Sequence, residues 1–276
     1  MNIKPTGKAL GVELSGVDLR QPMSAEDLAA AKDALVRNGV IFFRKQQLDS
    51  QQLVDFARGF GEIESYGSTL AQYLLPNQPE IIVLSNVIDD KGKAIGVVDA
   101  GGFWHTDRSY VAKPAWLSCL YALEVPQAED GTPVGDTEFA SMTAAFAALP
   151  EARRKYLETL TAEHEYVFRW SKKNDSMPPV QHPIILRHPV SKEPCLFVNK
   201  GFTHRVPGLS DEDSRDLLDE LFEYAARREF VYRHQWQAGD VLLWDNYATQ
   251  HFATGGYKWP QRRHLWRTTV QGFDLD

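Results

Sequence analysis

The order of its apolar runs constrains the fold of this chain more than any other sequence feature. Short runs rich in β-branched and aromatic residues, bounded by turn residues, are typical of buried strands. They cover residues 40–44, 81–87, 115–123, 195–199, 230–236, 241–246 and 264–271. Helical periodicity gathers instead within residues 24–39, 49–61, 141–160 and 210–226. Because strands and helices do not alternate strictly, we predict a mainly β fold, an antiparallel barrel or sandwich with flanking helices.

The helical segments carry recognisable start and stop signals. Ser24 precedes the first segment and Gly39 follows it, as expected for an N-cap and a C-terminal glycine. The second segment is expected to end at Gly61, and Ser210 precedes the last one, whose acidic first turn suits the helix dipole. No internal repeat, low-complexity tract or linker interrupts the chain, so we expect residues 1–276 to form one domain.

Composition and charge limit the partners of the protein. The net charge of −7 and the pI near 5.6 count against nucleic acid, because phosphate binding needs a basic surface. Cys119 and Cys195 are the two cysteines, too few for a disulfide framework, which favours a reducing compartment. The N-terminal residues lack the apolar core of a signal peptide, and no apolar run approaches the ~18 residues of a membrane span. We therefore expect a soluble, cytoplasmic protein without a membrane partner.

The run FWHTDRSY places His105 and Asp107 two residues apart. In an extended strand such residues point to one face, so an imidazole and a carboxylate would share a direction. With 8 histidines and 20 aspartates in 276 residues, chance supplies roughly 0.6 such triplets, so this one needs support. His251, which follows an apolar run within WDNYATQHFA, is a candidate third ligand. Two histidines and one carboxylate are typical of non-heme Fe(II) oxygenases, although a zinc hydrolase can use a similar set.

The last apolar run contributes two arginines. If a strand begins near Arg262, then Arg263, Leu265 and Arg267 share one of its faces. A buried guanidinium needs an anion, and its planar shape suits bidentate binding of a carboxylate. The pair is either a structural salt bridge of the barrel wall or a clamp for acidic ligands. Its position soon after His251 favours the clamp.

Five motifs, in the order FWHTDRSY, GDTEF, LFVNKGFTHRV, WDNYATQH and PQRRHLWRTTV, resemble the taurine and aryloxyalkanoate dioxygenases, a family of Fe(II)- and 2-oxoglutarate-dependent oxygenases. The segments GVELSGVDLRQP and VIFFRKQQL also resemble the start of that family, so the resemblance spans nearly the whole chain. It implies a double-stranded β-helix core, a jelly-roll or cupin-like barrel. It also implies Fe(II), 2-oxoglutarate and O2, with 2-oxoglutarate converted to succinate and CO2 while a substrate C–H bond is oxidised.

The resemblance also assigns roles to individual residues. It implies that His105, Asp107 and His251 bind the metal at the catalytic centre. Thr137 of the GDT motif and Arg263 would hold the distal carboxylate of 2-oxoglutarate, and Arg267 would bind the acidic group of the substrate. Four aromatic residues match, or lie near, positions that line the substrate pocket, with ordinary core packing as the alternative: Phe202, Tyr66, Tyr166 and Trp170.

The identity of the substrate stays open at this level. Tyr66 lies near the position where taurine enzymes carry a histidine that binds the sulfonate, which counts against taurine itself. We predict hydroxylation of a small anionic organic substrate, a carboxylate, sulfonate or phosphonate, by a homo-oligomer, as is common in the family. Two alternatives remain: a zinc-dependent hydrolase that uses the same His/Asp/His site, and a non-catalytic cupin-like binding protein.

Overall fold

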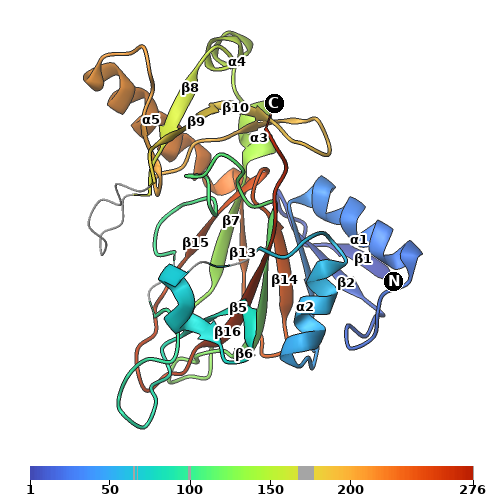
Figure 1. Ribbon diagram of the computed structural model, residues 1–276. Helices are drawn as coiled ribbons and strands as arrows, with labels where there is room; N and C mark the ends of the chain where they lie inside the picture. The colour runs from blue at the N-terminus through green and yellow to red at the C-terminus, as the bar shows by residue number, and fades with distance from the viewer. Residues whose placement is uncertain (65, 67, 99–100, 167–176, 276) are drawn as a thin grey trace.

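A large sheet of eight strands is the framework of the molecule in the computed structural model (Figure 1), which describes residues 1–276 except 65, 67, 99–100, 167–176 and 276. Its named strands pair antiparallel except for one parallel pair, β2 with β3. In order across the sheet the strands are β1 (Asn2–Pro5), β2 (Val12–Ser15), β3 (Val40–Phe43), β14 (Val241–Asp245), β6 (Leu117–Glu124), β16 (His264–Val270), β5 (Gln78–Ser85) and β4 (Leu74–Leu75).

Three smaller sheets complete the β structure of the described residues. They consist of β13 (Val231–His234), β7 (Thr137–Ser141) and β15 (Thr249–Ala253); of β12 (Thr203–Arg205), β8 (Thr161–His164) and β9 (Val180–Pro183); and of β10 (Ile185–Arg187) with β11 (Pro194–Leu196). The β13–β7–β15 sheet packs against one face of the large sheet, with the Phe139 ring 5.6 Å from that of Trp244. The two facing sheets form the double-stranded β-helix that the sequence predicts.

Helices cover the outside of this β core. Figure 1 shows α1 and α2 beside the outer face of the large sheet, and α3, α4 and α5 gathered with β8, β9 and β10 at one end of the molecule. The helices are α1 (Ala25–Asn38), α2 (Ser50–Arg58), α3 (Met142–Ala147), α4 (Glu151–Leu157) and α5 (Asp211–Ala225), with short 3₁₀ turns η1 (Ser68–Tyr73) and η2 (Arg228–Phe230).

The central strands are apolar on both faces because both faces are buried. In β3, Ile41 and Phe43 pack with the apolar residues of α1 and α2, whereas Phe42 points to the space between the two facing sheets. The same alternation holds in β16, where Leu265 belongs to the inner cluster and Trp266 packs on the outer one. Burial on both faces explains why these strands appear in the sequence as continuous apolar runs.

The predicted helix ends are confirmed at some positions and wrong at one. Ser24 caps α1 by accepting a hydrogen bond from a backbone N–H, and Gly39 follows the helix in the left-handed conformation at φ 69°. The second helix ends at Arg58 rather than at Gly61. Its end tightens early because the Gly59 and Phe60 amides bond to carbonyls three residues back.

Two strands that carry the site are missing from the sequence prediction. β7 and β15 contain many polar residues that the fold buries, among them Thr137, Gln250 and His251. The run 195–199 is also only partly a strand, since β11 covers Pro194–Leu196. Apolar periodicity cannot detect a strand whose buried positions are polar, which is why the structure shows more strands than predicted.

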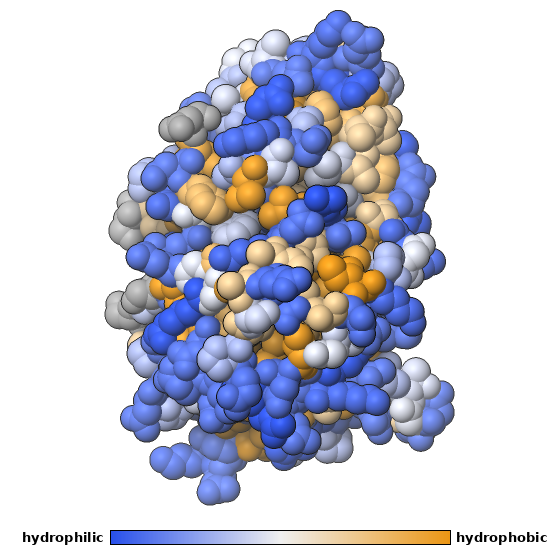
Figure 2. All heavy atoms as spheres, turned by 90° about the vertical axis from the view of Figure 1, so that its right-hand side faces the viewer, coloured by the Kyte–Doolittle hydropathy of each residue, from blue (hydrophilic) through white to orange (hydrophobic). Residues whose placement is uncertain are grey.

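A membrane span requires a long helix of mainly apolar residues. Among the residues that the structure describes, none of the helices is both long and apolar enough to cross a bilayer. The face that carries α1 and α2 is mostly hydrophilic, with apolar side chains scattered near its middle (Figure 2), which is common on protein surfaces. Cys119 and Cys195 are both buried free thiols, in agreement with the expected absence of disulfides.

The turn between β14 and β15 is fixed by the buried carboxylate of Asp245. This carboxylate accepts hydrogen bonds of 2.9 Å from Trp116 Nε1 and of 2.9 and 3.3 Å from the Tyr247 and Ala248 amides. His188 Nδ1 accepts hydrogen bonds from two backbone amides, so the ring proton is on Nε2. Nε2 lies 2.9 Å from Asp245 Oδ2 and donates a hydrogen bond to it. Asp245 therefore holds four donors together at the point where the chain turns into β15.

We predict that Asp245→Ala lowers the free energy of unfolding by about 3–5 kcal/mol, because it leaves buried donors unpaired. Urea denaturation is the measurement. Asp33→Ala is the matched control, since Asp33 is exposed and pairs only with Arg37 on the same helix, and it should change stability by less than about 0.5 kcal/mol. Equal effects of the two substitutions would contradict the role given to Asp245.

Candidate metal centre and active site

His105 and His251 lie side by side because their backbones form an isolated antiparallel bridge. The His105 amide donates to the His251 carbonyl at 3.1 Å, and the return bond is 2.9 Å. Their ring centroids are 4.0 Å apart. Gly101 packs against this pair: at φ 81°, a Cβ there would lie 2.7 Å from His105 Cε1, so only glycine fits without a shift. The extended geometry expected for the HTD triplet holds at His105 only, since Asp107 begins a turn.

The three predicted ligands converge. Asp107 Oδ1 lies 3.7 Å from His105 Nε2, and Asp107 Oδ2 lies 3.9 Å from His251 Nε2. One donor atom from each residue lies within 4.8 Å of the others. Donors at about 2.1 Å from one ion at right angles would be about 3 Å apart, so small side-chain rotations would close the set around a metal. Two neutral imidazoles and one carboxylate suit Fe(II) and leave further positions open.

The protonation states of the triad suit metal binding. His105 Nδ1 lies 2.8 Å from the Phe103 carbonyl oxygen and donates to it, which leaves the Nε2 lone pair free to face Asp107. Burial lowers the pKa of His105 and lowers that of His251 far below its ordinary value, so both rings are neutral. Burial alone would raise the pKa of Asp107, but the charge of Arg267 and the hydrogen bond from Ser118 hold it well below its usual range. Asp107 is therefore an ionised ligand beside two neutral ones.

A buried hydrogen-bond network holds the Asp107 carboxylate in place. Ser118 donates to Asp107 Oδ2 at 2.7 Å, and a guanidinium nitrogen of Arg267 lies 2.7 Å from the same oxygen. Asn246 accepts a 3.3 Å bond from the Asp107 amide and donates a 3.3 Å bond to the Ser118 hydroxyl. Neither residue was predicted from the sequence: Asn246 had a signal in its place within the WDNYATQH motif, whereas Ser118 stands in an apolar run that carries no such signal.

The two predicted arginines differ in their partners. Arg267, on the inner face of β16, is paired with Asp107. Arg263 precedes β16 and is 7% exposed, and its guanidinium carbon lies 5.7 Å from the Tyr257 ring centroid. Burial lowers the pKa of Arg263, and no carboxylate of the described residues forms an ion pair with it. A buried guanidinium without a carboxylate partner leaves room for an anionic ligand.

Thr137 lies on the strand next to the one that carries His251. β7 and β15 pair so that His251 is opposite Phe139 and Ala253 is opposite Thr137, which puts Thr137 on the same face as the histidine. Its hydroxyl accepts a 3.0 Å hydrogen bond from Trp236 Nε1. The hydroxyl proton of Thr137 is thereby free to be donated to a second group.

Aromatic side chains pack beside His105. The Phe202 ring is 6.1 Å from the His105 ring and 6.4 Å from that of Tyr166. Tyr110, which the sequence analysis did not single out, lies 4.7 Å from the rings of both Phe202 and Tyr166. Its signal was its place in FWHTDRSY, three residues after the second ligand.

The two remaining aromatic predictions have different outcomes. Tyr66 donates a 2.8 Å hydrogen bond to Thr269 on the inner face of β16, two residues beyond Arg267. Burial raises the pKa of Tyr66, which keeps the phenol neutral, while the Arg267 charge acts in the opposite direction. The structure therefore brings Tyr66 close to the site. Trp170 lies outside the described residues.

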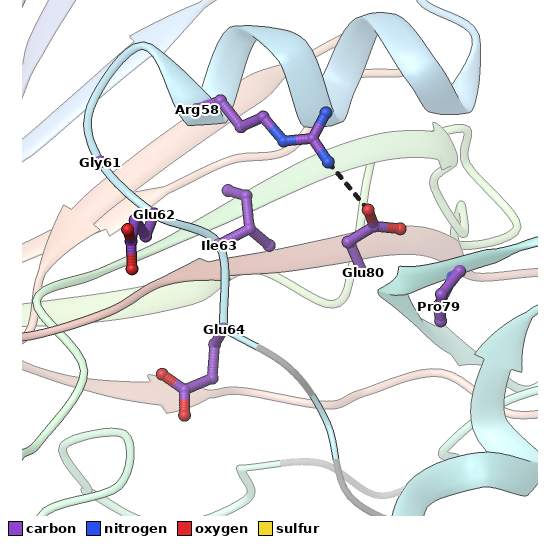
Figure 3. A pocket seen from close by; sticks show the side chains of 7 residues that line it. All are labelled: Arg58, Gly61, Glu62, Ile63, Glu64, Pro79 and Glu80. Carbon is purple, nitrogen blue, oxygen red and sulfur yellow. Dashed lines mark hydrogen bonds and ion pairs between the residues drawn. The ribbon is translucent and has the colours of Figure 1, made fainter.

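A surface cavity of about 750 Å³ lies apart from the triad (Figure 3). The end of α2, residues 61–64 and the start of β5 enclose it, and Arg58 and Glu80 point toward one another across it with a 2.9 Å ion pair. None of its lining residues is a member of the triad. The triad thus lies outside this cavity, although Glu64 of its lining forms an ion pair with Arg108, the residue after Asp107.

Comparison with known proteins agrees with the geometry. Residues 2–269 match the family described as taurine catabolism dioxygenase TauD, TfdA family. The α-ketoglutarate-dependent 2,4-dichlorophenoxyacetate dioxygenase of Cupriavidus pinatubonensis is 34% identical, over 95% of this chain and 94% of its own. A taurine dioxygenase structure from Burkholderia xenovorans superposes with a TM-score of 0.85 at 30% identity, over 99% and 89% of the two chains. The structure of AAD-2 with Mn(II) and N-oxalylglycine superposes with a TM-score of 0.82 at 27% sequence identity, over 99% of this chain and 98% of its own.

The fold, the triad and these similarities define an enzyme, an α-ketoglutarate-dependent dioxygenase. The chain belongs to the TauD/TfdA family of Fe(II)- and 2-oxoglutarate-dependent dioxygenases, and His105, Asp107 and His251 form its metal-binding triad.

We predict that Ser118→Ala weakens metal binding about 10- to 100-fold, because it removes the hydroxyl that orients the Asp107 carboxylate. Titration of the metal-free protein with Co(II) under nitrogen measures the dissociation constant. Ser15→Ala is the control, since Ser15 is an exposed residue of β2, and the sheet that contains β2 carries none of the three ligands. An unchanged dissociation constant in Ser118→Ala would show that Arg267 alone suffices to hold the carboxylate.

Proposed function

We propose that this dioxygenase oxidises, by hydroxylation, a C–H bond of a small anionic organic substrate, and that residues 1–276 form the one domain that does so. The observation that carries the proposal is the buried triad, with Arg267 of β16 paired to its carboxylate and the buried Arg263 directly before that strand. Relatives named for 2,4-dichlorophenoxyacetate and for taurine support an organic acid as the substrate. A zinc hydrolase would need the same ligands but would leave the buried Arg263 without a purpose.

The metal would be held by Nε2 of His105, the carboxylate of Asp107 and Nε2 of His251. Fe(II) there supplies the O2 chemistry that couples conversion of 2-oxoglutarate to succinate and CO2 with oxidation of the substrate. The protein would hold the three ligands from β15, from the isolated bridge at His105 and from the turn at Asp107. Its own contribution to the rate is to position the reactants and to exclude water.

Arg263 and Thr137 are suited to hold the distal carboxylate of 2-oxoglutarate. Arg263 is buried and lacks a carboxylate partner among the described residues, so binding of an anion would remove the cost of an uncompensated charge. Thr137 accepts its hydrogen bond from Trp236 and retains a proton to donate. Two donors to one carboxylate would orient the cosubstrate toward the triad.

Arg267 is suited to bind the acid group of the substrate. One of its nitrogens contacts Asp107, while its Nε is buried and has no hydrogen-bond partner in the described part of the chain. A substrate acid bound there would lie next to a metal ligand, which would place its nearest C–H bonds beside the metal. Phe202 and Tyr166 would pack on the organic part of the molecule and keep water away.

The iron assignment is tested by adding Fe(II) and 2-oxoglutarate to the protein without oxygen. We expect a weak visible charge-transfer band, and succinate after O2 is admitted with one of a panel of sulfonates, aryloxy acids, phosphonates and amino acids. His105→Ala and His251→Ala should lose the band and the succinate. His204→Ala, a change at a half-exposed histidine outside the triad, should keep both. Absence of band and succinate in the unaltered protein would refute the oxygenase function on these substrates.

Arg263→Gln should raise the KM for 2-oxoglutarate about 10- to 100-fold, which corresponds to the loss of one or two charge-assisted hydrogen bonds. A high concentration of 2-oxoglutarate should restore most of the rate. The neighbouring Arg262 provides a matched control, because it is exposed and pairs with Glu124, so Arg262→Gln should leave the KM within about twofold. Steady-state succinate assays measure both, and a similar KM in both variants would remove Arg263 from the cosubstrate site.

A further inference from the structure

Arg108, directly after the ligand Asp107, has an unusual backbone and an unusual partner. Its φ of 58° is in the left-handed region, which non-glycine residues rarely adopt and which often marks functional sites. One terminal nitrogen lies 3.0 Å from Glu64 Oε1, and the two side chains are 29% and 18% exposed. The Arg108 Nε is buried and has no hydrogen-bond partner among the described residues. The guanidinium therefore has a donor to spare.

Arg108 and Arg267 are both close enough to Tyr66 and Tyr110 for their charges to act on these phenols. Tyr66 is hydrogen-bonded to Thr269 beside Arg267, and Tyr110 packs on Phe202 at the aromatic side of the triad. Burial raises the pKa of both phenols, and the charges of both arginines act on each of them in the opposite direction. Both arginines also lie beside Asp107: Arg108 is the next residue in the chain, and Arg267 contacts the Asp107 carboxylate at 2.7 Å.

A backbone hydrogen bond fixes the position of Glu64, the residue that pairs with Arg108. The Glu64 amide donates a 2.8 Å bond to the Thr269 carbonyl, which attaches this segment to the edge of β16. In Figure 3 the Glu64 carboxylate points away from Arg58 and Glu80, which pair with each other. Glu64 is therefore available to Arg108 and is partly exposed to solvent, where a competing anion can reach the pair.

We propose that Arg108 is a second substrate-binding cation, which with Arg267 binds the acid group of the substrate after that group displaces Glu64. The inference rests on the proposed function, because it concerns the same substrate. It implies a head group with at least two oxygens, such as a carboxylate, sulfonate or phosphonate, that can accept from both guanidiniums. The Glu64 carboxylate occupies Arg108 before the substrate arrives and so lowers the affinity for weaker anions.

The test is calorimetric titration of protein loaded with Zn(II) and 2-oxoglutarate, which cannot turn over, with 2,4-dichlorophenoxyacetate and with taurine. Arg108→Gln should raise the dissociation constant of the acid that binds about tenfold, whereas Glu64→Gln should lower it severalfold. In the Arg108→Gln background, Glu64→Gln should have no further effect. The dissociation constant of 2-oxoglutarate should stay the same in all three variants.

Arg37→Gln is the matched control, because Arg37 is an exposed arginine in a single ion pair with Asp33. A purely structural Arg108–Glu64 bridge would make Glu64→Gln weaken binding as much as Arg108→Gln, and that result would overturn the inference. The inference would also be overturned if Arg108→Gln bound the acid as tightly as Arg37→Gln does. If the unaltered protein releases succinate with an acid but Arg108→Gln binds that acid normally, the inference fails while the function stands. If it binds neither acid and releases no succinate, both fail.

Discussion

The pair of backbone hydrogen bonds between His105 and His251 is the contact on which the metal centre depends. Side chains alone could not hold two neutral imidazoles 4.0 Å apart in a buried site, but a β-bridge fixes both main chains. The loop that contains His105 is joined in this way to β15, and Asp245 determines where β15 begins. Errors in that turn would move His251 relative to His105 and separate the ligands. The fold therefore supplies the geometry before any metal binds.

Charge balance is the second constraint on this interior. Asp107 is ionised because Arg267 lies against it, whereas burial lowers the pKa of both histidines and keeps them neutral and able to bind a metal. The positive charges of Arg263 and Arg108 are balanced differently. Arg263 has no carboxylate partner among the described residues, whereas Arg108 is paired with Glu64. An enzyme whose cosubstrate and proposed substrate are both acids needs such cations, and of these two only Arg108 has a carboxylate partner to give up among the described residues. Because of this difference, a substitution at one arginine can change the affinity for one acid without changing the affinity for the other.

The sequence predicted the layers of the fold better than the strands of the site. Apolar runs identified β3, β14 and β16 because both faces of these strands are buried in apolar surroundings. The strands β7 and β15 bury polar residues, so hydropathy did not identify them. Thr137 was found only through a motif that resembles a known family, whereas His251 was a candidate ligand because it follows the apolar run of β14. Contacts such as that of Asn246 with the Asp107 amide join residues that are distant in the chain. No spacing rule within one sequence predicts them.

The most direct test of the account is a crystal structure of this protein with Mn(II) and N-oxalylglycine, the pair present in the AAD-2 structure. We predict a metal bonded at about 2.0–2.3 Å by His105 Nε2, the Asp107 carboxylate and His251 Nε2. The distal carboxylate of N-oxalylglycine should contact Arg263 and Thr137. A metal bound elsewhere, or bound without His251, would contradict the central claim.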